Sequence, residues 1–295
     1  MPNRQLFNQE FGWYKGNLHT HTTMSDGVKS PQECIKIFKK AEYDFLSITD
    51  HWQLADEISC EGMIIFRGCE YHFIYGDSRR ACHIVAVCIE SILKKNNSLS
   101  PQDAINDIRR QGGISIVAHP HWSYMSHQDL YDLKEYDGVE IYNSLCAVEK
   151  DNGDASSYID VISTKGVAPL LFATEDTHRY TRELFGGFIM VNSPEFTHAS
   201  LLESIKKGRF YCSQDPAIKQ IEIDGESIHI KTSPVKHIIF HPDSHWTGSH
   251  IFAPEGEYIT EASNKIHPLN RTIRVECIDG NGKKAWSQLI HVNRH

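Results

Sequence analysis

Short apolar runs alternate with amphipathic segments through the first two thirds of the chain. The runs that predict buried strands are residues 45–49, 114–118 and 169–173. The segments that predict helices follow Ser30-Pro31 and Ser100-Pro101 and span residues 156–165 and 197–207. Because strands and helices alternate, we expect parallel strands joined by right-handed crossovers, as in a β/α barrel.

One segment departs from this alternation. Residues 63–73 and 83–89 are both strand-like, and the polar stretch from Tyr75 to Arg80 between them is too short for a crossover helix. The pattern therefore predicts an antiparallel hairpin at this point of the α/β scheme.

The pattern of apolar and polar residues changes after about residue 212. Short strand-like runs at residues 218–223, 227–231 and 272–277 are separated by Asp-Gly, Ser-Pro and Asn-Gly turns, without a helical period. We therefore expect two domains, an α/β barrel over residues 1–212 and a small all-β sandwich over residues 213–295.

Composition narrows the function classes. The formal net charge is −8 and there is no basic run, so we expect no extended nucleic-acid surface, although a small nucleotide stays open as a ligand. No apolar stretch approaches the roughly 20 residues of a membrane span, and the first eleven residues lack a signal-peptide core. The eight cysteines include no CxxC pair, which favours free thiols in a reducing cytoplasm.

Residues able to bind metal ions recur in the first 178 positions, mostly just after a predicted strand. The nine candidate ligands are His19, His21, Asp26, His51, Glu70, His83, His119, Asp176 and His178. Imidazole and carboxylate without cysteine suit Zn²⁺, Mn²⁺ or Fe²⁺. A single histidine is more often a structural residue than a metal ligand. A metal site is therefore indicated by where these nine residues stand relative to the strands and to each other, not by the number of histidines.

Local spacing supports part of this set. His19 and His21 alternate with period two, so an extended strand sends both rings to one side, and the same holds for Asp176 and His178. Asp26 stands before a glycine, and taken alone the pair is typical of a plain turn. Two neighbours are candidates for orienting ligands rather than binding metal, namely Asp50 beside His51, and His121 beside His119.

The ordered motifs HTHTTMSDG, ITDH, GCE, HIVAV, AHP and EDTH resemble the polymerase-and-histidinol-phosphatase (PHP) superfamily over residues 15–210. The stretch Gly208–Tyr211, with Asp215-Pro216 and a β-rich end, resembles the branch named after carbaryl-type ester hydrolases, which carries a C-terminal β-sandwich. The resemblance implies a distorted seven-stranded β/α barrel with two or three divalent metal ions at its mouth.

The resemblance also implies how the ligands divide among the ions. His19, His21, Glu70 and Asp176 would bind the first ion. Asp26, His51 and His178 would bind the second, and Glu70, His83 and His119 the third. A hydroxide between the first two ions, held near Glu70 and Asp176, would be the nucleophile.

Charge favours a phosphorylated substrate. Three divalent ions set against Asp26, Glu70 and Asp176 leave a surplus of about +3, which suits a phosphate ester better than a neutral carbonyl compound. Arg179 follows the last ligand motif, and Arg79 and Arg80 precede His83, so these three could bind phosphate. The sequence thus predicts a phosphoesterase for a small phosphorylated molecule, with a nucleotide among the candidates.

Two alternatives stay open. A carbamate or carboxylic-ester hydrolase would use the same ions to polarise a carbonyl group. A metal-stabilised scaffold or binding protein would need one closed site, which the large ligand set disfavours. The sequence specifies neither the native metal nor the oligomeric state.

Overall fold

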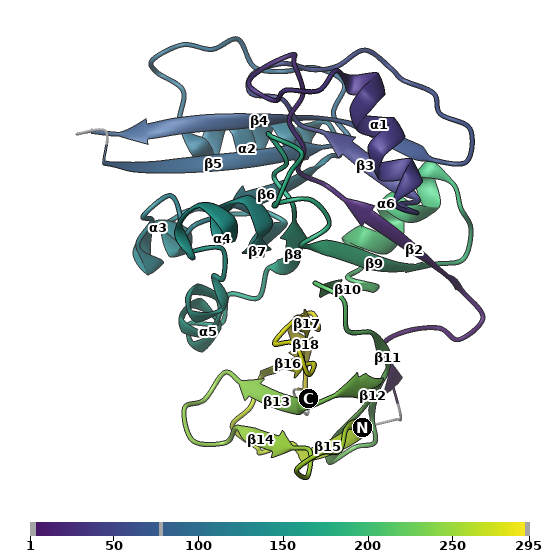
Figure 1. The fold of residues 1–295 in the computed structure, drawn as a ribbon. Coiled ribbons are helices and arrows are strands. Elements are labelled where there is room, and N and C mark those ends of the chain that lie inside the picture. Colours follow the sequence, from purple (N-terminus) through teal and green to yellow (C-terminus); the bar gives the residue numbers. More distant parts are fainter. Residues whose placement is uncertain (1–3, 77–78, 293–295) are drawn as a thin grey trace.

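The computed structural model of the protein describes residues 4–76 and 79–292 (Figure 1). Its helices are α1 (Pro31–Lys40), α2 (Pro101–Arg110), α3 (His127–Asp132), α4 (Ser144–Lys150), α5 (Ser156–Thr164) and α6 (His198–Lys206). The predicted starts of α1 and α2 are confirmed, since Ser30 and Ser100 each form a capping box with the residue three positions later. The sequence pattern did not indicate α3 and α4, which are only six and seven residues long.

The strands of the first two thirds lie side by side in chain order. They are β2 (Gly12–Asn17), β3 (Phe45–Ile48), β4 (Ile64–Tyr75), β5 (Arg80–Val87), β6 (Ile114–Ala118), β7 (Gly138–Asn143) and β8 (Leu170–Thr174). Pairing is parallel from β2 to β4 and from β6 to β8, while β5 is antiparallel to both of its neighbours. The predicted hairpin of β4 and β5 is therefore confirmed, although residues 77 and 78 of its loop lie outside the described residues.

The predicted seven-stranded barrel is not confirmed, because the sheet is not closed. Strands β2 and β8 do not form a ladder; an isolated bridge between Thr20 and Thr177 joins the chain just beyond them. Strand β9 (Phe188–Ser193) instead pairs with β2 in antiparallel register from Gly12 to Gly16. This ladder occupies the edge of β2 that closure would need, so the seven strands form an open arc.

The same sheet continues into the C-terminal part of the chain. Beyond β9 it passes through β10 (Phe210–Ser213), β17 (Lys284–Trp286), β16 (Thr272–Ile278), β13 (His237–Pro242) and β14 (Ser249–Phe252), and β18 (Ile290–His291) also pairs with β16. A second sheet contains β1 (Arg4–Gln5), β11 (Ile218–Ile223), β12 (Ser227–Val235) and β15 (Ile259–Lys265). Apolar residues of both sheets form one buried cluster. From β10 onward the elements of the described residues are all strands.

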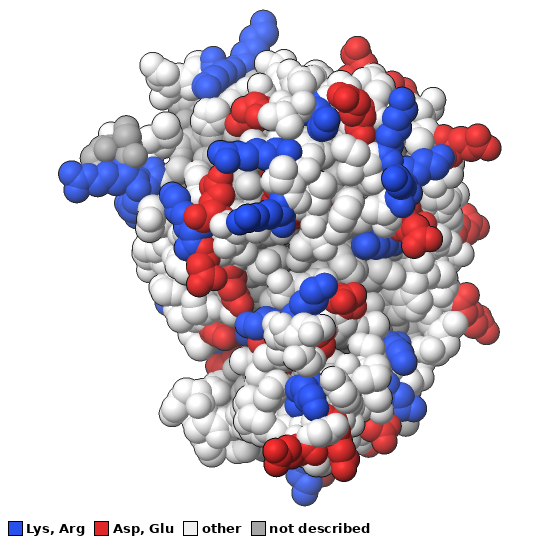
Figure 2. All heavy atoms as spheres, in the orientation of Figure 1, with Lys and Arg blue, Asp and Glu red and all other residues white. Residues whose placement is uncertain are grey.

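The N-terminal strand β1 lies beside β11 in the C-terminal sheet (Figure 1). The division at residue 212 stays a prediction, and the structure adds that residues 4 and 5 pair with the C-terminal part rather than with the arc. No helix within the described ranges is long and apolar enough to cross a membrane. The face shown in Figure 2 has basic and acidic side chains interspersed.

Candidate metal centre

The nine predicted ligands converge at one end of the arc. His19 and His21 follow β2, His51 follows β3 and His119 follows β6, whereas Glu70 and His83 lie within the β4–β5 hairpin. Asp176 and His178 follow β8, and the bridge between Thr20 and Thr177 brings this segment alongside the first histidine pair. The carboxyl ends of parallel strands meet at one edge of a sheet, which explains why residues so far apart in sequence assemble here.

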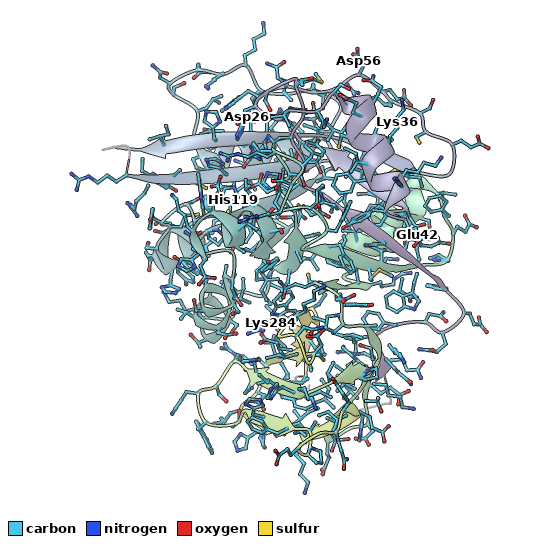
Figure 3. All side chains as sticks on the ribbon, in the orientation of Figure 1. Asp26, Lys36, Glu42, Asp56, His119 and Lys284 are labelled. Carbon is cyan, nitrogen blue, oxygen red and sulfur yellow. The ribbon has the colours of Figure 1, made fainter. Side chains whose placement is uncertain are left out.

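Their side chains form three overlapping groups of donor atoms. Within each group the donor atoms lie within 4.8 Å of one another. The groups are His19, His21, Glu70 and Asp176; His21, Asp26, His51 and His178; and Glu70, His83 and His119. Asp26 and His119, both labelled in Figure 3, belong to the second and third groups. The three sets are those that the resemblance implied, with His21 shared between the first two.

Glu70 is the residue that joins the groups. Its carboxylate is 1% exposed. Atom Oε2 lies 3.3 Å from His19 Nε2 and 3.1 Å from His51 Nδ1, and Oε1 lies 2.7 Å from His83 Nδ1 and 3.4 Å from His119 Nε2. A single carboxylate therefore faces histidines of all three groups.

The donor set fits divalent cations. Asp176 Oδ1 is buried and accepts no hydrogen bond from any described residue, yet it faces the Nε2 atoms of His19 and His21 at 3.2 and 3.3 Å. A buried carboxylate oxygen without a donor is costly unless a cation faces it. The chemistry of the groups, imidazole and carboxylate, matches first-row divalent ions.

The pKa values of the histidines and of the carboxylates in the donor groups depend strongly on each other. Burial alone would raise the pKa of the Glu70 carboxyl, but the charges of His19, His83 and His51 hold that pKa well below its usual range. Burial alone would lower the pKa of His19, but Asp176, Glu70 and Glu140 hold it well above its usual range. Imidazole and carboxylate groups thus stabilise each other's charged forms here, and a divalent ion would compete with protons for the same donor atoms.

Two buried polar residues that the sequence reasoning missed support the ligands. Glu140 on β7 accepts a hydrogen bond from His19 Nδ1 at 2.7 Å. Asn143, at the end of β7, donates from Nδ2 to Asp176 Oδ2 at 3.1 Å. A signal was present for Glu140, because a carboxylate inside the apolar run of residues 138–141 must find buried partners.

The predicted roles of Asp50 and His121 need correction. The Asp50 carboxylate accepts hydrogen bonds from the Thr22 backbone N–H at 2.8 Å and from Ser25 Oγ at 2.6 Å, so it shapes the loop before Asp26 instead of orienting His51. His121 is exposed, with Nδ1 3.1 Å from the Asp154 carbonyl oxygen. Sequence adjacency to a ligand did not place either side chain against that ligand.

A cavity of about 330 Å³ opens over the donor groups. Besides ligands it is lined by Val28, Trp122, Leu145, Glu149 and Arg179. Arg179 lines this cavity, whereas Arg79 and Arg80 line a neighbouring cavity that shares His83 and Trp122 with the first. Arg80 also pairs with Asp129 at 2.8 Å.

No protein-family model matches the chain. An uncharacterized protein of Methanocaldococcus jannaschii is 27% identical over 149 residues, which take in 44% of this chain and 82% of that protein.

Two solved structures resemble the chain. A two-domain protein from Bacteroides vulgatus that contains a predicted PHP-like metal-dependent phosphoesterase superposes with a TM-score of 0.56 at 14% identity, covering 99% of this chain and 98% of that one. An amidohydrolase from Chromobacterium violaceum, with bound sulfate and no metal, has a TM-score of 0.43 at 15% identity and covers 66% and 96%. The first likeness shows that the chain shares the overall fold of that protein over nearly its whole length. The carbaryl-hydrolase-like branch stays a prediction.

Proposed function

We propose that the protein is a metal-dependent hydrolase, and specifically a phosphoesterase that acts on a small phosphorylated molecule such as a nucleotide. The observation that carries the proposal is the set of three overlapping imidazole and carboxylate groups beneath an open cavity. A structural metal site is closed by its ligands, whereas a catalytic site keeps a position open to substrate.

The residues of the centre have distinct tasks. Two or three divalent ions bound there would polarise the phosphoryl group and lower the pKa of a water molecule. Glu70 would hold neighbouring ions in one arrangement, because its two oxygens face different donor groups. With the buried Glu140 counted beside the three ligand carboxylates, the surplus of charge falls to about +2, which still favours an anionic substrate.

The cavity walls supply binding and orientation. Arg179 is exposed at the site, where its guanidinium can donate two parallel hydrogen bonds to a phosphate group. Trp122 and Leu145 give the cavity an apolar wall, which limits water around the reacting group. Arg79 and Arg80 line the neighbouring cavity, and in this proposal they would contact a part of the substrate that extends past Trp122.

Cleavage of phosphate esters tests the proposal. The purified protein, loaded with Mn²⁺, Zn²⁺ or Fe²⁺, is assayed against phosphomonoesters, phosphodiesters and nucleotides, with the double variant His19→Ala and His21→Ala as the negative control. We expect metal-dependent cleavage that is lost in the control, measured as free phosphate from monoesters and as the released alcohol or nucleoside product from diesters and nucleotides. Cleavage of aryl esters or carbamates without cleavage of any phosphate ester would overturn the phosphoesterase assignment, and no turnover of any ester by metal-loaded protein would overturn the hydrolase.

A further inference from the structure

Glu140 is a buried carboxylate that none of the three donor groups includes. It is 1% exposed. Oxygen Oε1 accepts from His19 Nδ1 and from Thr174 Oγ1, both at 2.7 Å, and Oε2 accepts from the His119 backbone N–H and from Asn143 Nδ2, both at 2.9 Å. Four donors from four segments thus fill the acceptor positions of one side chain.

The hydrogen bond with His19 determines which ring nitrogen can bind metal. Because a carboxylate can only accept, His19 Nδ1 carries the proton that faces Glu140. The lone pair of a neutral ring is then on Nε2, which lies 3.3 Å from Glu70 Oε2 and 3.2 Å from Asp176 Oδ1. The tautomer that Glu140 selects is therefore the one that serves the first donor group.

The other oxygen of Glu140 reaches two further ligands. The backbone of His119 has a φ of +26°, a strained value for a residue with a side chain, and its N–H is held by Oε2. Asn143 Nδ2 donates both to Glu140 Oε2 and to Asp176 Oδ2 at 3.1 Å, which leaves Asp176 Oδ1 facing the histidines. Glu140 thus connects ligands of the first group with a ligand of the third.

We propose that Glu140 is a positioning residue that sets the tautomer of His19 and couples metal binding at the first and third donor groups. This inference rests on the proposed metal centre. It assigns Glu140 no contact with substrate, and its effect passes through His19, Asp176 and His119.

The substitution Glu140→Gln separates this role from simple packing. Glutamine has nearly the same shape but keeps a single acceptor oxygen. The His119 backbone N–H cannot be reoriented, so the amide oxygen is expected to stay there and the NH₂ group to face His19 Nδ1. Nδ1 of His19 must then accept a hydrogen bond, so the ring proton moves to Nε2. A protonated Nε2 cannot bind a metal ion.

Metal binding is the measurement. Zn²⁺ and Co²⁺ are titrated into metal-free wild type, Glu140→Gln and Asp137→Asn, with bound metal counted after dialysis. Asp137 is a matched control, because its carboxylate accepts from Ser115 N at 2.8 Å at the opposite end of β7. We expect roughly 10–100-fold weaker binding and loss of bound metal in Glu140→Gln, and wild-type affinity in Asp137→Asn.

The outcomes separate this inference from the proposed function. Wild type that binds no divalent metal would overturn both. Wild type that binds metal, with Glu140→Gln equal to it, would overturn the role of Glu140 alone.

A measurement on the wild type covers the case in which Glu140→Gln does not fold. In ¹⁵N-histidine NMR of the zinc-loaded protein, with His19 assigned by substitution, we expect a protonated Nδ1 and a metal-bound Nε2. A His19 ring bound through Nδ1 would contradict the proposal.

Discussion

Oxygen Oε2 of Glu70 lies 3.0 Å from Nε2 of His21, at the centre of the first donor group. The other oxygen of Glu70 faces the third group, and His21 also belongs to the second. The three donor groups are therefore not independent sites, and a change at either residue should alter more than one of them.

The substitution Glu70→Gln should remove the bridge. Substitution of a residue that only orients metal ligands typically lowers metal affinity or activity 10–100-fold. For Glu70, which faces the donor groups directly, we expect kcat/KM to fall at least about 100-fold and the metal content to decrease. Steady-state kinetics and metal analysis measure the two effects. Glu203→Gln, an exposed change on α6 beside Lys207, should behave as wild type. Full activity in Glu70→Gln would contradict the bridging role.

Removal of metal should lower stability as well as activity. Ions that bind only the folded protein stabilise it by about 2.7 kcal/mol when their free concentration is 100 times Kd. We expect EDTA to lower Tm and abolish turnover, and added Mn²⁺ or Zn²⁺ to restore both. Thermal unfolding followed by circular dichroism, with Zn²⁺-saturated EDTA as a control, makes the comparison. A Tm that is the same with and without metal would count against a metal centre built into the fold.

Arg179→Ala should mainly weaken substrate binding. A hydrogen bond to a charged group contributes about 1.5–3 kcal/mol, so KM should rise roughly 10–100-fold with a smaller change in kcat. Arg179→Lys keeps the charge but lacks the planar fork, and it should recover part of the loss. Arg109→Ala, which breaks a surface pair with Glu135 and does not line the cavity, is the control. Unchanged kinetics in Arg179→Ala would remove this residue from the binding site.

Arg274 supports the fold rather than the site. Its buried guanidinium donates to Glu276 Oε2 at 3.1 Å on its own strand β16 and to Asp160 Oδ1 at 2.7 Å on α5. Arg274→Met removes one partner of the buried Glu276 carboxylate, which keeps Lys284 Nζ at 3.2 Å and Trp286 Nε1 at 2.9 Å, so we expect a loss of about 1–3 kcal/mol in the free energy of unfolding. Urea denaturation measures the loss, and metal content should not change. The double variant Arg274→Met with Glu276→Gln should recover part of the lost stability. Equal stability of the wild type and Arg274→Met would show that the pair of Arg274 and Glu276 contributes nothing.

Thiol reactivity should follow burial. All eight cysteines, each within the described residues, are free, and burial raises the pKa of the Cys34 and Cys69 thiols to about 12. Cys60 is half-buried, and Lys39 Nζ lies 3.9 Å from its sulfur. We expect iodoacetamide to alkylate Cys60 before Cys34 or Cys69 in the native protein, as followed by peptide mass spectrometry. Early labelling of Cys69 would show that the core opens more readily than the packing implies.

Much of the local structure could be predicted because its cause lies within a few residues. The capping boxes at Ser30 and Ser100 depend on side chains three positions away. Strand β6 was predicted with its observed bounds, since its five residues are all buried and flanked by turn residues. Ligands that follow strands could likewise be placed at one edge of a sheet before the structure was known.

The open sheet could not be predicted in this way. Whether β8 or β9 pairs with the second edge of β2 depends on contacts between residues more than 150 positions apart. The hydrophobic pattern of β8 or β9 alone does not indicate which strand it pairs with. Glu140 was missed for a related reason. Its role depends on His19, which approaches it only when β2 and β7 lie on facing sides of the arc.

The pairing of Arg4 with Ile223 has a consequence for how the chain is made. The segment that leads into His19 and His21 is anchored at its start by a strand that a ribosome delivers some two hundred residues later. Until that strand emerges, β1 has no neighbour to pair with, and the sheet that β1 joins is completed only by β15 at residues 259–265. The docking of β1 must therefore wait at least until β11 has been synthesised, so that this contact is among the slow, non-local steps of folding.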